Sequence, residues 1–203
     1  HAVTVFNRTR SAADPLVALG ASVASAPADV LGAEIVITML ADDAALNEVA
    51  LGENGLIACL GADSIHVAMG THSVALIRSL TEAHAQANRT FVAAPVLGRP
   101  DAAAAGQLGV VPAGPAAAVA RCQPLFAVIG RRSFEAGEKP ESAAAVKLAN
   151  NFVLGCAIEA MGEAFALVEK FGVNPPAFYD VLTDGLFSAP AYKIYGKIIV
   201  EKA

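Results

Sequence analysis

Short apolar runs alternate with helix-like segments over the first two thirds of the chain. Runs rich in β-branched residues predict strands at residues 2–6, 34–40, 61–69 and 90–94. The segments between these strands have helical character at about 12–19, 26–31 and 73–87, with a short extended piece at 21–23. Strands that alternate with helices form parallel sheets with right-handed crossovers. The pattern therefore predicts an α/β fold, a Rossmann-like doubly wound parallel sheet.

Two further strands are predicted after this alternation, at 108–113 and 125–129, on either side of an alanine-rich helix at 115–121. The character of the sequence then changes at the turn 137–140. We therefore expect a dinucleotide-binding domain at 1–138 and an all-α C-terminal domain at 139–203.

A long helix opens the C-terminal part, because the pattern is helical from residue 141 to about 170. Its apolar residues lie on nearly every face, so we expect it to be buried between two domains or two subunits. Gly172 ends it, and Asn174 followed by two prolines begins another helix. Only helices are expected beyond this point.

Composition narrows the class of protein. Hydrophobic residues make up 55% of the chain and charged residues 16%, which is enough apolar material for a large core. No run of 18 or more apolar residues lacks a charge or a breaker, and we expect no membrane segment. The chain begins at His1 without the basic and apolar regions of a signal peptide, so we expect a cytoplasmic protein.

Charge and cysteine content exclude further classes. The net charge is −5 and the 14 basic residues are scattered, which argues against a nucleic-acid surface. Cys59, Cys122 and Cys156 form no CxxC pair and lie in apolar surroundings, so we interpret them as buried free thiols. No histidine cluster has metal-ligand spacing, and His72 and His84 are interpreted as surface residues.

Lys147 and Asn151 are the first candidates for chemistry. They lie four residues apart on the long helix and point the same way, so they can act on one small ligand. The spacing equally fits a solvated pair. The apolar context favours a functional lysine, because an ammonium group without a carboxylate at i±3 or i±4 needs water, a cleft or a ligand.

Two polar turns follow strands and are candidates for cofactor binding. Asn7, Arg8 and Thr9 come directly after the first strand, where an acidic residue would select NAD and an arginine would accommodate the 2′-phosphate of NADP. No acid precedes Asp14, which favours NADP; a capping turn with exposed arginines is the alternative. Thr71 stands at a helix start, where a hydroxyl caps the helix or binds a ligand.

Five motifs, taken in order, carry a resemblance to a known family: VTVFNRT at 3–9, IVITMLADD at 35–43, MGTHS at 69–73, APVLG at 94–98 and KLANN at 147–151. In this order and spacing they resemble the β-hydroxyacid dehydrogenases, which include 3-hydroxyisobutyrate dehydrogenases and tartronate semialdehyde reductases and are related to 6-phosphogluconate dehydrogenase. The resemblance spans nearly the whole chain. It implies an NAD(P)-dependent oxidoreductase, with NADP(H) preferred and NAD(H) as the alternative cofactor.

The resemblance also implies roles for single residues. Lys147 matches the catalytic lysine, and Asn151 the asparagine that helps to hold the substrate. The cofactor loop and the residue near the nicotinamide match Met39, Leu40, Ala41 and Thr71. Gly98 matches a glycine of the substrate loop, and Thr71 is expected to contact substrate as well. The implied chemistry is hydride transfer to or from a carbonyl or alcohol carbon, with Lys147 exchanging the proton on oxygen.

The sequence departs from the family pattern at several places. The family's Gly-rich phosphate loop and first strand are expected before His1, and further helices are expected after the last residue, so both domains are expected to be incomplete here. Gly70 stands where many members have serine, and Leu97 and Arg99 replace a serine and a glycine of the substrate loop. Arg99 can replace the lost hydroxyls with a charge-assisted hydrogen bond to a substrate carboxylate.

Two other functions share these features. An imine reductase has the same fold and NADPH preference but usually lacks a lysine at position 147. A non-catalytic member would use the fold for binding or oligomerisation and would be expected to have lost that lysine. In each case a small-molecule ligand and a homodimer or higher homo-oligomer, formed through the C-terminal helices, are the expected partners.

Overall fold

The computed structural model describes residues 2–30 and 32–201, without the side chain of Val30. It divides into two compact units, His1–Lys147 and Leu148–Ala203. The division falls inside one long helix rather than at the turn 137–140, because the first two turns of that helix pack onto the first unit through Ala143 and Ala144.

The first unit begins with a small parallel pair of strands, β1 (Thr4–Val5) and β2 (Ser22–Val23). The 3₁₀ turn η1 (Arg10–Ala13) and the short helix α1 (Asp14–Val17) connect them, and a second 3₁₀ turn, η2 (Pro27–Val30), follows. The helical segment expected at 12–19 is present as η1 and the short helix α1, and the one expected at 26–31 is present as the 3₁₀ turn η2, with residue 31 outside the described residues.

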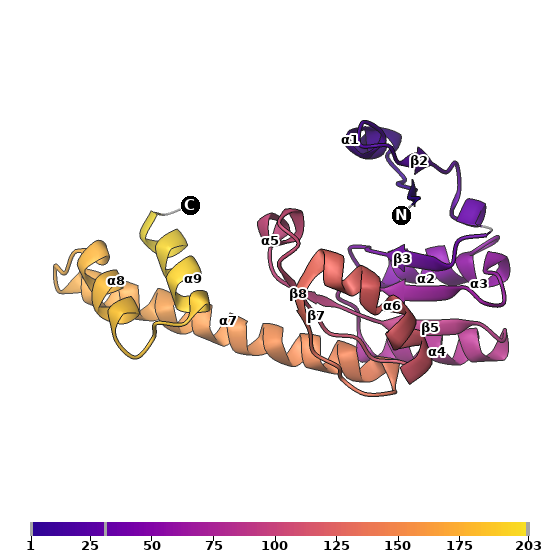
Figure 1. Cartoon of the computed structure of the whole chain (residues 1–203). Helices are drawn as coiled ribbons and strands as arrows, with labels where there is room; N and C mark the ends of the chain where they lie inside the picture. Colours follow the sequence, from indigo (N-terminus) through magenta and orange to yellow (C-terminus); the bar gives the residue numbers. More distant parts are fainter. Residues whose placement is uncertain (1, 31, 202–203) are drawn as a thin grey trace. The chain divides into compact units, whose positions relative to one another are not determined.

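The central sheet has three parallel strands in the order β3 (Ile35–Thr38), β4 (Ile65–Ala68) and β5 (Thr90–Ala93) (Figure 1). Helices α2 (Asp43–Leu51) and α3 (Leu56–Cys59) join the first two strands, and α4 (Val74–Gln86) joins the last two. The Asp42 side chain caps α2 through the Ala45 N–H at 2.8 Å, and Ser73 caps α4. The predicted strand–helix alternation is confirmed here.

A second three-stranded sheet follows, in the order β6 (Val96–Leu97), β7 (Leu108–Val110) and β8 (Gly130–Ser133). Strand β6 is antiparallel to β7, and β8 is parallel to it. Helix α5 (Pro100–Ala104) lies between β6 and β7 in sequence, and α6 (Ala116–Ile129) between β7 and β8.

The strand predicted at 125–129 is wrong, because these residues form the last turns of α6. Pro124 lies inside that helix, three residues beyond the predicted helix end at 121. Cys122 and Phe126, four residues apart, are both buried on one side of α6, which shows that the helical period continues past the proline. Of the two predicted strands, the first is present as β7. The second is replaced by the end of α6, and the edge strand β8 follows it.

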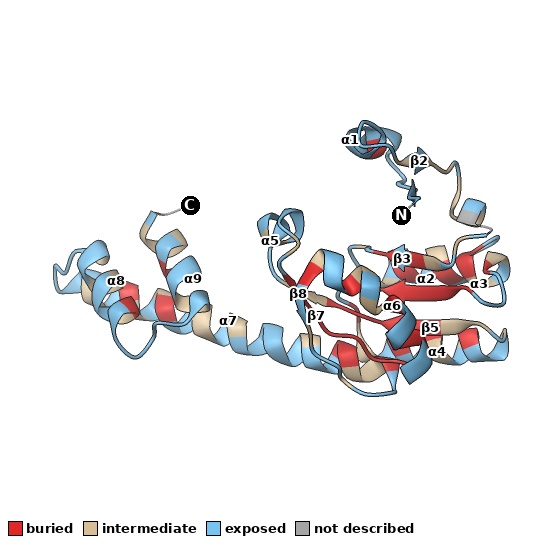
Figure 2. Ribbon diagram, in the orientation of Figure 1, coloured by how far each residue is buried: buried red, intermediate tan, exposed pale blue. Residues whose placement is uncertain are grey.

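Two apolar clusters cover opposite faces of the sheet. Figure 2 colours much of the strands β4 and β5 as buried. One cluster joins β4 and β5 to α2 and α4 through Leu46, Leu80 and Phe91. The other joins the same strands to α6 through Val67, Val92 and Phe126. Helices on both faces of a mainly parallel sheet make this a doubly wound α/β unit, which confirms the predicted fold class.

Two histidines that were interpreted as surface residues are buried. His84 is fully buried in α4 and its Nδ1–H donates to the Leu80 carbonyl at 2.7 Å. Its Nε2 therefore accepts from His66 Nδ1–H at 3.0 Å, and His66 Nε2 accepts from the Thr38 hydroxyl at 2.9 Å. Both rings are neutral in this chain of hydrogen bonds, and burial lowers the pKa of each ring.

The three cysteines have different surroundings. Cys122 is buried, and burial raises the pKa of its thiol to about 11. Cys59 is half-buried and Cys156 is exposed, so the interpretation of all three as buried is wrong for Cys156. Cys156 lies on a solvent-exposed face of the long helix Pro140–Lys170.

In the second unit the described residues, up to 201, form helices and no strand, as predicted. Helix α7 (Pro140–Lys170) begins in the first unit and continues into the second, where α8 (Pro175–Asp184) and α9 (Pro190–Glu201) follow. Phe165 packs edge-on against Phe178 with ring centroids 5.0 Å apart. The expectation that α7 is buried on several sides is not met within the chain, because Phe152 is 72% exposed and Val153 is exposed beside it.

Candidate functional site

The carboxyl ends of β3, β4 and β5 meet at one edge of the central sheet. Thr38, Ala68 and Ala93 are partners in register. The Met69 N–H donates to the Thr38 carbonyl at 2.8 Å, and the Ala94 N–H donates to the Ala68 carbonyl at 2.7 Å. The segments that follow the three strands therefore share this edge: residues 39–42, 69–73 and 94–95. Ligands of doubly wound sheets bind at this edge.

The residues expected beside the nicotinamide lie together there. Met39, Leu40 and Ala41 follow β3, and Thr71 follows β4. Met39 is 65% exposed, and Ala41 and Thr71 are exposed as well, whereas Leu40 is partly buried against the core. The structure thus brings the two predicted segments to one edge and leaves three of the four side chains accessible.

Lys147 reaches the same part of the first unit from α7. Its ammonium group donates to the Val96 carbonyl at 2.7 Å, directly beyond the carboxyl end of β5. The side chain is half-buried, and burial lowers its pKa. No ion pair to Lys147 is found among residues 2–30 and 32–201. A lysine ammonium has three N–H donors, so two remain for a ligand.

Asn151 lies one turn beyond Lys147 on α7, in the second unit, and is exposed. Its amide has both a donor and an acceptor for a ligand. The joint action of Lys147 and Asn151 on one substrate stays a prediction.

The predicted substrate loop follows β6. Gly98 has φ +141°, and a Cβ there would lie 2.8 Å from Leu108 Cδ2 and 3.3 Å from Ala102 Cβ. Both the backbone conformation and the close neighbours therefore require glycine. Arg99 is exposed, and its Nε lies 3.9 Å from Asp101 Oδ1. This contact is long and exposed, so it leaves the guanidinium free to bind an anion.

Replacing Gly98 with alanine is expected to lower the free energy of unfolding by about 1–3 kcal/mol, because the new methyl group is strained at this φ and meets Leu108. Urea denaturation measures the change. Gly162→Ala is the matched control, since that helical glycine has no atom within 4 Å of an added Cβ and alanine favours helix. Equal stability of Gly98→Ala and wild type would contradict the strained conformation.

The predicted 2′-phosphate turn follows β1. The Asn7 side-chain oxygen accepts the Thr9 N–H at 2.8 Å, which closes a turn characteristic of asparagine. Asn7, Arg8 and Thr9 are all exposed. Among the described strands none pairs β1 or β2 with β3, so the hydrogen bonding does not connect this turn to the strand-edge residues.

Two residues at the edge, Asp43 and His72, were not predicted as site residues from the sequence. Asp43 Oδ1 accepts the Ser73 N–H at 3.0 Å and lies 3.3 Å from His72 Nδ1. Burial raises the pKa of Asp43, but the hydrogen bonds from Ser73 and His72 outweigh it and leave the pKa below its usual value. His72, interpreted as a surface residue, is only 3% exposed. The sequence signal for a buried His72 was Gly70 two residues earlier, because a glycine has no side chain and leaves space for the imidazole ring.

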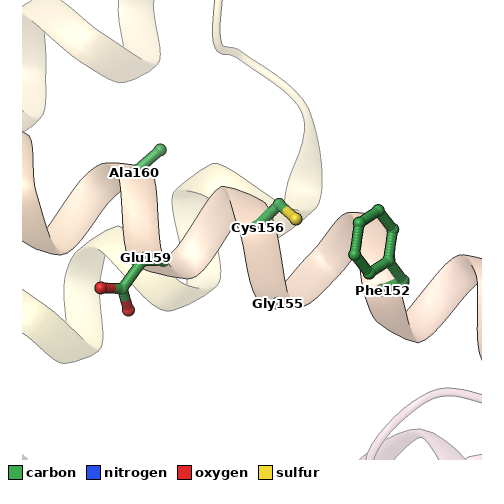
Figure 3. A pocket seen from close by; sticks show the side chains of 5 residues that line it. All are labelled: Phe152, Gly155, Cys156, Glu159 and Ala160. Atoms are coloured by element: carbon green, nitrogen blue, oxygen red, sulfur yellow. The ribbon is translucent and has the colours of Figure 1, made fainter.

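A shallow hollow lies on α7 (Figure 3). It is lined by Phe152, Gly155, Cys156, Glu159 and Ala160. All five residues come from one helix, and Glu159 is the only charged one. In the described part of the chain no group of three or more His, Cys, Asp or Glu side chains could hold a metal ion.

Comparisons with known proteins identify the family. The model for the NAD binding domain of 6-phosphogluconate dehydrogenase matches residues 1–137. The model for the NAD-binding domain of NADP-dependent 3-hydroxyisobutyrate dehydrogenase matches residues 142–201. The chain belongs to the β-hydroxyacid dehydrogenase family. Members of this family are NAD(P)-dependent dehydrogenases, and the predicted resemblance is confirmed.

Two relatives illustrate the similarity. The chain is 41% identical over 203 residues to the uncharacterized oxidoreductase YfjR of Bacillus subtilis, covering all of this chain and 71% of that protein. It is 33% identical over 183 residues to the 3-hydroxyisobutyrate dehydrogenase of Pseudomonas aeruginosa, covering 90% of this chain and 61% of the relative. The chain thus spans about three fifths to seven tenths of the length of these two relatives.

Solved structures show the same β-hydroxyacid dehydrogenase fold. Psf3, in complex with NADP⁺ and 2-OPP, superposes with a TM-score of 0.91 at 23% identity, covering 100% of this chain and 72% of that one. An imine reductase of Streptomyces aurantiacus superposes with a TM-score of 0.78 at 27% identity, covering 98% and 69%. The fold is therefore shared with an imine reductase and with a protein that was solved with NADP⁺ bound.

Proposed function

We propose that the full-length protein transfers a hydride between NADP(H) and a small carbonyl or hydroxy-acid-like substrate, with Lys147 as general acid and base. The observation that carries this proposal is the position of Lys147. Its ammonium group is half-buried, is held by the Val96 carbonyl and has no ion pair among the described residues. Such a lysine is positioned to exchange a proton with a ligand oxygen.

The residues at the sheet edge fit a nicotinamide cofactor. Met39, Leu40, Ala41 and Thr71 would lie beside the nicotinamide, because they are gathered where doubly wound sheets bind such ligands. When bound, the reduced nicotinamide supplies the hydride. Lys147 gives a proton to the substrate oxygen as the carbonyl carbon receives the hydride, so that a ketone or aldehyde becomes an alcohol; in the reverse direction neutral Lys147 takes that proton.

Among the predicted substrate-binding residues, Arg99 and Asn151 fit a substrate that carries a carboxylate. Arg99 beside Gly98 presents an exposed guanidinium, and Asn151 presents an amide. Arginine binds carboxylates through charge-assisted hydrogen bonds. The name of the Pseudomonas relative, a 3-hydroxyisobutyrate dehydrogenase, supports a small hydroxy acid.

Imine reduction is the second candidate function, favoured by the similarity to the Streptomyces aurantiacus imine reductase. An imine nitrogen also needs a proton, which Lys147 could supply. Assays of NADPH oxidation with small semialdehydes and with cyclic imines distinguish the two functions. Turnover of imines alone would overturn the carbonyl proposal.

For the cofactor we expect Arg8→Ala to weaken NADPH binding by about 10- to 100-fold and to leave NADH binding nearly unchanged, because the guanidinium would pair with the 2′-phosphate. Calorimetric titration of the full-length protein measures both affinities. Arg10→Ala, a neighbouring exposed arginine, is the matched control. Equal loss for both nucleotides, or no loss, would refute a 2′-phosphate site at Arg8.

A partner surface is proposed for α7. Pro140–Lys170 is long and apolar enough, by length and composition, to cross a membrane, although the sequence led us to expect no such segment. We propose that another protein subunit, rather than lipid, covers its exposed face, because the 3-hydroxyisobutyrate dehydrogenase model matches this helix. The exposed cysteine on the same face fits a reducing cytoplasm, which we propose as the location.

The subunit proposal predicts that Phe152→Asp shifts the full-length protein from a homodimer or larger homo-oligomer toward monomer, since a charge would replace an apolar side chain that is 72% exposed in the single chain. Sedimentation velocity measures the mass. Val128→Asp, at a similarly exposed apolar position on α6, is the control. A monomeric wild-type protein, or partition of the wild type into vesicles, would contradict the proposal.

A further inference from the structure

The starts of α2 and α4 are tied together beside the strand edge. Asp43, in the first turn of α2, accepts the Ser73 N–H at the start of α4. His72, one residue earlier, is buried, and its Nδ1 lies 3.3 Å from the same carboxylate oxygen. Because a carboxylate only accepts hydrogen bonds, Nδ1 carries the hydrogen. Asp43 thus fixes which way the His72 ring faces.

Gly70 provides the space that the ring occupies. A Cβ on Gly70 would lie 2.4 Å from His72 Nε2 and 2.7 Å from the Leu40 carbonyl oxygen. No side chain fits there while the ring is in place. The imidazole therefore fills the volume that a side chain at position 70 would take, next to the main chain of the predicted cofactor loop.

The remaining ring nitrogen needs an explanation. His72 Nε2 is buried and has no hydrogen-bond partner in the described part of the chain. A buried nitrogen without a partner costs stability, so an apolar side chain would fill this volume at lower cost if packing were the only role. What histidine adds is the directed bond from Nδ1 to Asp43.

Thr71 is the residue that this arrangement holds in place. Gly70 and His72 on either side of it are buried, whereas Thr71 is exposed at the edge. With the ring hydrogen-bonded to Asp43 and packed into the space at Gly70, the Thr71 backbone is fixed from both neighbours. The Leu40 carbonyl bounds the same space from the other loop.

We propose that His72 is a positioning residue, which fixes Thr71 against the Leu40 main chain and so sets the geometry in which the hydride is transferred. This inference rests on the proposed function for its effect on turnover. A small displacement of aligned groups reduces the rate of the chemical step far more than it reduces binding.

The test compares full-length His72→Leu with His84→Leu. Both replace a buried histidine that forms hydrogen bonds, but His84 lies at the other end of α4 and contacts Leu80 and His66 instead. We expect His72→Leu to lower kcat by about 10- to 100-fold while the Kd for NADPH changes by less than roughly threefold. His84→Leu is expected to lower Tm and to keep wild-type kcat well below that temperature. Wild-type kcat in folded His72→Leu would overturn the proposal.

Hydrogen exchange gives a second readout that does not need turnover. In His72→Leu the amides of residues 69–76 are expected to exchange at least about tenfold faster than in wild type, while His84→Leu leaves them unchanged. If the wild-type protein reduces no substrate, the proposed function fails, but this local measurement still decides whether His72 holds the loop. Unchanged exchange in His72→Leu would overturn the positioning role in either case.

Discussion

Lys147→Met is expected to lower kcat by about 10²- to 10⁴-fold, the usual contribution of a positioned general acid. Methionine has a similar length and no charge, so it keeps the packing of α7 and removes the proton donor. The Kd for NADPH is expected to stay nearly unchanged, because the ammonium group is held by the Val96 carbonyl. Steady-state kinetics and nucleotide titration measure the two quantities separately.

The pH profile gives a second signature of Lys147. Burial lowers its pKa, so the charged donor form is lost at a lower pH than for an exposed lysine. Reduction of the carbonyl is therefore expected to decline as the pH rises through this lowered pKa, and alcohol oxidation to rise. Lys170→Met, which removes an exposed lysine at the end of α7, should change neither rate nor profile. Full activity in Lys147→Met would refute its role.

The second large effect is loss of stability in mild acid. His66 is fully buried, and burial together with the neighbouring His84 lowers its pKa to about 3 from 6.5. The unfolded chain therefore binds a proton that the folded chain excludes, so stability is lost as the pH falls from about 6.5 towards 3. The difference between the two pKa values corresponds to roughly 3–6 kcal/mol. This is a large part of the stability of an ordinary domain.

Urea denaturation between pH 6.5 and 5 isolates this effect, because carboxyl groups titrate mostly at lower pH. The free energy of unfolding is expected to fall by at least about 1 kcal/mol per pH unit near pH 5. His66→Leu should be less stable at pH 7, since the Thr38 hydroxyl and His84 Nε2 lose their partners, but its stability should depend less on pH. A pH-independent wild type would contradict the neutral histidine pair.

The strand–helix alternation was predictable because its strands are short β-branched runs bounded by turns. The residues at the carboxyl ends of the strands were predictable only from the family resemblance, which the order of the motifs carries. No spacing within the sequence shows that Met39 lies beside Thr71. Parallel pairing of β3 and β4 brings them together. That contact depends on the register of strands far apart in sequence, which a local pattern does not contain.

Other features depended on tertiary packing and were predicted wrongly. Residues 125–129 were predicted to form a strand, yet burial of Cys122 and Phe126 on one face of α6 continues the helix. His72 and His84 looked like surface residues because histidine is polar. Their burial depends on partners at Asp43 and His66, distant in sequence, and on the space at Gly70.

The most direct test of the proposed chemistry uses the full-length protein with NADPH that carries deuterium at both hydrogen positions of nicotinamide C4, together with small semialdehydes. We expect mass spectrometry of the alcohol product to find one deuterium on the former carbonyl carbon. Lys147→Met is expected to form this product at least about 100-fold more slowly while still binding NADPH. Product without deuterium, or no binding of either nucleotide by the wild-type protein, would contradict hydride transfer as the function.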